Sequence, residues 1–150
     1  MSQSPTMLLR DDILIRRIPP TRESFVTIVM THNGRYRAAS SMLSVDADED
    51  DLSCSLLRIT TPLELLEYLE QQQIDSNGWH ICAFRVRDVQ DLGFQVCHTP
   101  AERDAGHCSI SNPVGGPRFP ESKAKKLAKK ALVLNEDEIQ DPTLISRSLP

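Results

Sequence analysis

The alternation of apolar and polar positions predicts strands in the first third of the chain. The run ILIRRI (13–18) alternates imperfectly and stops at Pro19-Pro20, because the residue before a proline avoids the helical region. The β-branched run FVTIVM (25–30) is typical of a buried strand. Asn33-Gly34 is a strong turn signal, and RAASSMLSV (37–45) would be the returning strand. Residues 25–45 are therefore predicted to form a hairpin.

Two segments have the pattern of helices. Thr61-Pro62-Leu63-Glu64 offers a side-chain cap, a proline for the first helical position and the glutamate of a capping box, so a helix should start there and end before Asn77-Gly78. A second helix is predicted over 122–134, with apolar residues at helical spacing. The residues expected to form its buried stripe are Ala124, Leu127, Ala128, Ala131 and Leu132.

The remaining pattern predicts three more strands, over 79–86, 94–98 and 107–111, with one helical turn at 88–92. The expected fold class is α+β, with a mainly antiparallel sheet of about five to six strands and two principal helices. Residues 1–10 are expected to be a loose lead-in, 11–134 a single domain, and 135–150 a loose acidic and polar tail.

Composition narrows the class of protein. The 150 residues are 39% hydrophobic and 25% charged, which is typical of globular chains. The formal net charge of −4 argues against a nucleic-acid binder, which usually has a basic footprint. No signal-peptide pattern opens the chain, and no apolar run reaches the roughly 18 residues of a membrane span. With four cysteines and no disulfide framework, a cytoplasmic protein without membrane contact is expected.

Cysteine and histidine residues gather in the last three predicted strands. If these strands are adjacent, His80, Cys82, Cys97 and His107 could form a zinc site, because thiolate and imidazole are zinc ligands. His98 and Cys108 lie in the same strands, and the six residues together also permit a cysteine–histidine nucleophile pair. No C-x₂₋₄-C spacing is present, so we favour buried structural thiols with no metal and no cofactor.

The second predicted helix is strongly basic. Its apolar stripe predicts a docked helix with a solvated lysine face. Such a face could meet phosphate, an anionic membrane or an acidic protein, and Lys123, Lys126 and Lys130 are the candidate contacts to a partner protein. The acidic run Glu136-Asp137-Glu138 follows directly and could neutralise part of this face.

Several segments resemble an uncharacterised family of small bacterial proteins. They are RRIPP (16–20), SSMLSVD (40–46), LGFQV (92–96), Pro100, Gly106-His107 and the closing basic helix, and together they span about residues 12–134. The resemblance implies a bacterial origin and a complete domain, and it brings no established activity.

A second resemblance concerns the site of ADP-ribosyltransferases. In those enzymes a strand arginine and a serine-rich strand hold NAD, and Arg17 with Ser40 and Ser41 could match these two features. The glutamate of a later strand has no counterpart in 79–86 or 94–111 outside the loop residue Glu102. An NAD-dependent transferase therefore stays an alternative.

No cluster combines a nucleophile, a base and an orienting group. The sequence therefore favours a non-enzymatic accessory or protein-interaction component of a bacterial multi-component system, such as a defence or toxin-related one. The alternatives are the NAD-dependent transferase and a small zinc-stabilised domain.

Overall fold

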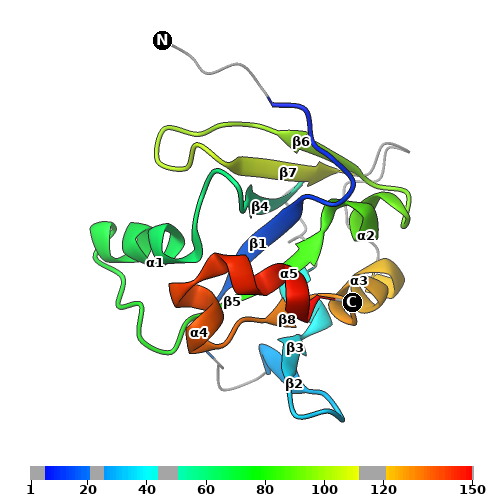
Figure 1. Cartoon of the computed structure of the whole chain (residues 1–150), viewed down its shortest axis with the longest axis horizontal. Helices are drawn as coiled ribbons and strands as arrows, with labels where there is room; N and C mark the ends of the chain where they lie inside the picture. Colours follow the sequence, from blue (N-terminus) through cyan, green and yellow to red (C-terminus); the bar gives the residue numbers. More distant parts are fainter. Residues whose placement is uncertain (1–5, 21–25, 44–50, 112–120, 150) are drawn as a thin grey trace.

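One antiparallel sheet organises the chain. The computed structural model describes residues 6–20, 26–43, 51–111 and 121–149, and the structural statements below concern these residues. Eight strands follow the order β2-β3-β8-β5-β1-β4-β7-β6, and every neighbouring pair is antiparallel (Figure 1). The strands are β1 (Ile13–Ile18), β2 (Ile28–Met30), β3 (Tyr36–Ala38), β4 (Leu52–Leu56), β5 (His80–Arg85), β6 (Gln95–His98), β7 (His107–Ser111) and β8 (Leu132–Val133).

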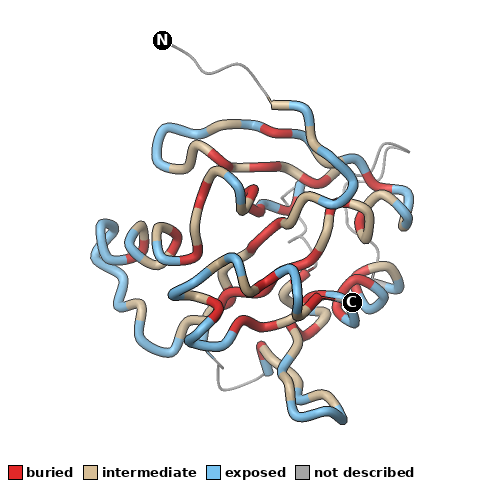
Figure 2. Tube along the Cα trace, in the orientation of Figure 1, coloured by how far each residue is buried: buried red, intermediate tan, exposed pale blue. Residues whose placement is uncertain are grey.

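Helices cover both faces of this sheet. They are η1 (Ser40–Leu43), α1 (Pro62–Gln71), α2 (Val86–Gln90), α3 (Glu121–Ala128), α4 (Glu136–Gln140), η2 (Pro142–Leu144) and α5 (Ile145–Ser148). One core cluster joins Leu14 and Phe84 of the sheet to Leu127 of α3. The other joins Ile15 of the sheet to Leu65 of α1 and to the C-terminal segment. The central strands β1 and β5 are therefore largely buried, as the tube in Figure 2 shows.

The expected α+β class and antiparallel sheet are confirmed, but the sheet has eight strands rather than five or six. β4 was not predicted, because Ser53 and Ser55 give it one polar face and no apolar run. β8 lies within the predicted helix 122–134, which ends at Ala128. Leu132 and Val133 leave the helix because they pair with β5 and β3 and close the sheet.

The start of α1 was predicted correctly from its capping residues. The Thr61 side chain accepts a hydrogen bond from the Glu64 amide, and Glu64 accepts one from the Thr61 amide, so the capping box is formed.

The predicted returning strand 37–45 is reduced to β3 and is followed by η1, with 44–45 outside the described residues. No helix in the described ranges is long and apolar enough to cross a membrane.

The expectation of a loose C-terminal tail is wrong for residues 135–149. Asn135 caps α4 through a second capping box with Glu138, and Ile145 and Leu149 are buried against the face that carries Ile15. The spacing of Ile145 and Leu149 puts both on one side of the last turn, where they pack on the sheet.

Glu138 holds this segment to the β2–β3 hairpin. Its Oε1 accepts hydrogen bonds from Arg35 Nη2 at 2.6 Å and from the Asn135 amide at 2.9 Å, and the residue is 3% exposed. Burial alone would raise the pKa of this carboxyl, but the hydrogen bonds from Asn135 and Arg35 outweigh burial and leave its pKa below the ordinary 4.5. The charged form of Glu138 therefore stabilises the fold.

This carboxyl should give the protein an acid-sensitive component of stability. Because its folded-state pKa is lowered, the stabilisation is complete above the unfolded-state pKa and is lost as pH falls through the folded-state pKa. Urea unfolding from about pH 7 down to about pH 3 should show a smaller loss of unfolding free energy for Glu138→Gln than for the unchanged protein. Equal losses in the two proteins would contradict this role.

Candidate functional site

A cationic hollow lies at the end of the sheet where the β2–β3 hairpin meets the α3–β8 turn. This basic groove has a volume of about 500 Å³. It is lined by Thr31, His32, Asn33, Arg35, Arg37, Lys129, Lys130, Leu132 and Ser148. An adjoining hollow of about 300 Å³ shares Arg37 and Lys129 and adds Lys125. No carboxylate of the described residues lines either hollow, although the chain as a whole is acidic.

The central cation of this groove is Arg37, and the pairing of β3 with its two neighbours fixes its position. Arg37 lies in the middle of β3, opposite Val29 of β2 and Leu132 of β8. Lys129 and Lys130 are exposed in the turn after α3, which the Lys130 amide closes by donating to the Leu127 carbonyl at 2.8 Å. Arg35 is neutralised by Glu138, whereas no ion pair joins Arg37, Lys129 or Lys130 to another described residue. These three side chains therefore present positive charge to solvent.

Apolar side chains stand on the same hairpin. Met30 is 58% exposed and Tyr36 is 41% exposed, and the two are cross-strand neighbours on β2 and β3. Val26, just before β2, is 55% exposed. Because side chains alternate along β3, Met30 and Tyr36 lie on the face of the hairpin opposite Arg37, so they do not line the groove.

The three lysines predicted to contact a partner have different environments. Lys123 is half-buried: its Nζ donates to the Leu92 carbonyl at 2.7 Å and lies 5.1 Å from the centroid of the Phe94 ring, so it anchors α3. Lys126 is exposed but lines neither cationic hollow. Lys130 lines the basic groove. Sequence reasoning missed Arg37, although the spacing in RYR (35–37) puts both arginines on one face of a strand.

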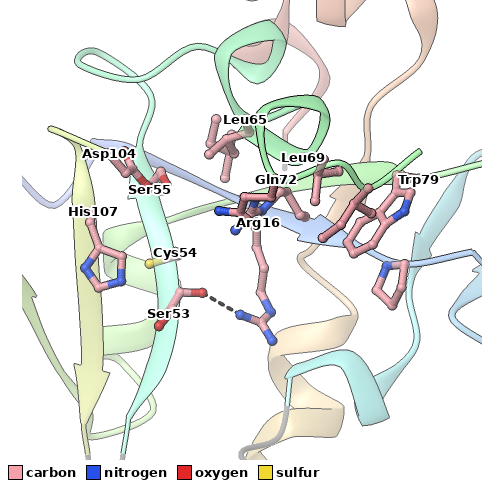
Figure 3. Close-up of a pocket in the computed structure, with 14 residues that line it drawn as sticks. Arg16, Ser53, Cys54, Ser55, Leu65, Leu69, Gln72, Trp79, Asp104 and His107 are labelled. Atoms are coloured by element: carbon pink, nitrogen blue, oxygen red, sulfur yellow. Dashed lines mark hydrogen bonds between the residues drawn. The ribbon is translucent and has the colours of Figure 1, made fainter. Parts of the chain in front are cut away.

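A second hollow, the polar pocket, lies between α1 and strands β1, β4 and β7, and has a volume of about 360 Å³ (Figure 3). Asp104 stands at its rim and ties three segments together. Its carboxylate accepts hydrogen bonds from the Ser55 hydroxyl, from the Thr60 hydroxyl at 2.6 Å and from the Gly106 amide at 3.1 Å. Because both carboxylate oxygens accept hydrogen bonds, Asp104 orders the loop before β7.

Arg17 lines the same pocket from β1 and is the least satisfied cation there. Its Nη1 is buried without a hydrogen-bond acceptor in the described chain. Leaving a buried donor unpaired costs about 1–3 kcal/mol, and more for a charged group. The neighbouring Arg16 differs, because it donates to the Met42 and Ser53 carbonyls at 2.9 and 2.5 Å.

The alternative zinc set is not brought together. The strands that carry it were expected to be adjacent, but β1 and β4 separate β5, with His80 and Cys82, from β7, with His107. In the described ranges no group of three or more His, Cys, Asp or Glu side chains could hold a metal ion.

The buried histidine and thiols have structural environments. His98 accepts from the Thr6 amide at Nδ1 and contacts the Ala105 carbonyl at Nε2, both at 2.8 Å. Burial raises the pKa of Cys82 to about 12. The pKa of Cys54 is raised by its hydrogen bond with Cys108 and by burial. Both thiols stay protonated at neutral pH, which disfavours metal binding and nucleophilic attack. Cys97 is exposed on β6.

The alternative NAD-binding residues are also apart. Alternating side chains on β1 put Arg16 and Arg17 on opposite faces. Arg16, and not Arg17, reaches η1, the segment that contains Ser40 and Ser41. The structure therefore does not join Arg17 to the serine pair.

Comparison of the chain with protein-family models, with curated proteins and with solved structures finds no match.

Proposed function

We propose that this protein is a non-enzymatic interaction protein whose basic groove binds an acidic segment of a partner protein. The observation that carries the proposal is that Arg37, Lys129 and Lys130 lie together on a chain of net charge −4, with no carboxylate of the described residues in the lining. Local charge of opposite sign to the whole molecule steers and orients a partner. The partner belongs, in this proposal, to a bacterial multi-component system.

The surroundings of the groove favour a protein over a nucleic acid. Apart from His32, no aromatic ring in the part of the chain that the structure describes lines the groove, so successive bases have no surface on which to stack. The acidic balance of the chain also repels a long polyanion beyond the groove.

Charge reversal in the groove tests this function. A labelled octaglutamate peptide should bind the unchanged protein at low salt, and binding should weaken as salt screens the charges. Replacing Lys129 and Lys130 together by glutamate should weaken binding about tenfold or more, since repulsion replaces attraction at two positions. Fluorescence anisotropy measures both effects.

Arg103→Glu with Lys126→Glu is the matched control, because it changes the net charge equally at exposed positions outside the groove. This control should bind the peptide nearly as well as the unchanged protein. Equal weakening by the two double variants, or tighter binding of an oligonucleotide of the same charge, would contradict the proposal.

A further inference from the structure

The polar pocket has two chemically different walls. In Figure 3, Leu65 and Leu69 descend from α1 and Trp79 stands beside them. Ser53, Ser55 and His107 lie on the other side, on β4 and β7. Pocket and groove have no lining residue in common, so the pocket is independent of the proposed partner-binding surface.

Arg17 is the cation in this pocket that can bind an anion. Arg17 is fixed on β1, a central strand that pairs with β5 at six positions. Its buried Nη1 has no acceptor in the described chain, and none of the ion pairs among the described residues involves Arg17. A planar guanidinium with free donors is matched by the two oxygens of a carboxylate.

Charge limits the ligand to a monoanion. Among the described residues, those with a charge that line the pocket are Arg16, Arg17 and Asp104, with a formal sum of +1 when His107 is neutral. Arg16 already donates to two backbone carbonyls, so Arg17 is the group to be neutralised. A dianionic phosphate would leave one charge uncompensated beside Asp104.

The wall formed by α1 and Trp79 favours an anion that carries an apolar group. Leu65 and Leu69 are buried, and Trp79 is half-buried with its amide held by the Ser76 carbonyl at 3.1 Å. Sites for small molecules combine such apolar walls with a few fixed polar groups, and about 360 Å³ lies at the small end of their volumes.

We infer that this pocket binds a small organic monocarboxylate with an apolar or aromatic body, with its carboxylate on Arg17 and its body against α1 and Trp79.

Ligand titration of the intact protein tests the inference. The probes are 3-phenylpropanoate, indole-3-acetate and hexanoate, with 3-phenylpropanamide and inorganic phosphate as neutral and dianionic comparisons. At least one carboxylate should quench Trp79, the chain's one tryptophan, with a dissociation constant of about 1 mM or tighter, whereas the amide and phosphate should not. Arg17→Met should abolish this quenching.

Thermal unfolding without ligand separates binding from folding. Nη1 of Arg17 donates no hydrogen bond within the described residues. The melting temperature of Arg17→Met should therefore equal or exceed that of the unchanged protein. Arg16→Met should melt lower, since it leaves the Met42 and Ser53 carbonyls without their donor. Failure of all three carboxylates to bind, equal binding by Arg17→Met, or stronger binding of phosphate or the amide would overturn the inference.

Discussion

Replacing Leu127 with aspartate should destabilise the fold by about 4 kcal/mol or more, the largest effect expected of a single substitution here. Leu127 is 0% exposed on α3, between residues of the sheet's first core cluster. A carboxylate in that position is buried without a partner. The melting temperature should fall by about 10–20 °C in a calorimetric scan.

Lys126→Asp on the same helix is the control. Lys126 is exposed, so the same new charge meets solvent and should change stability by less than about 1 kcal/mol. Comparable melting temperatures for the two variants would mean that α3 does not dock by its Ala/Leu stripe.

Gly106→Ala is the second substitution with a large expected effect, about 2–3 kcal/mol of lost stability. A Cβ at Gly106 would lie 2.5 Å from Thr60 Oγ1 and 3.0 Å from the Leu56 carbonyl oxygen. Thr60 is 1% exposed and its hydroxyl is held by Asp104, so it has little room to move. Urea unfolding measures the loss.

A double-mutant cycle shows whether this clash is the cause. In a Thr60→Ala background the hydroxyl is gone, so adding Gly106→Ala should cost clearly less than it does alone. Strict additivity of the two substitutions would contradict the steric explanation.

The features that were predicted correctly from the sequence are those determined by residues close together in the chain. The capping box at Thr61 and Glu64 placed the start of α1, and the helical spacing of Ala124, Leu127 and Ala128 identified the buried stripe of α3. β4 was not predicted, because its buried face carries Leu52, Cys54 and Leu56 between serines and its partners lie 40 to 58 residues away in sequence.

The candidate sites depend on contacts that no local pattern contains. Arg37 and Lys130 meet because β8 inserts between β3 and β5. Placing β8 required knowing that the helical pattern of 122–134 breaks at Ala128, and the apolar spacing continues past that point. The position of Arg37 in the groove could not be predicted for the same reason, since a strand arginine can equally pack or pair.

Mapping the octaglutamate peptide by amide chemical shifts tests the central proposal most directly. If the basic groove is the partner-binding surface, the largest shifts should fall in residues 29–39 and 125–132 and should fade as salt rises. Shifts centred on the polar pocket or scattered over the surface, or no shifts at low salt, would contradict it.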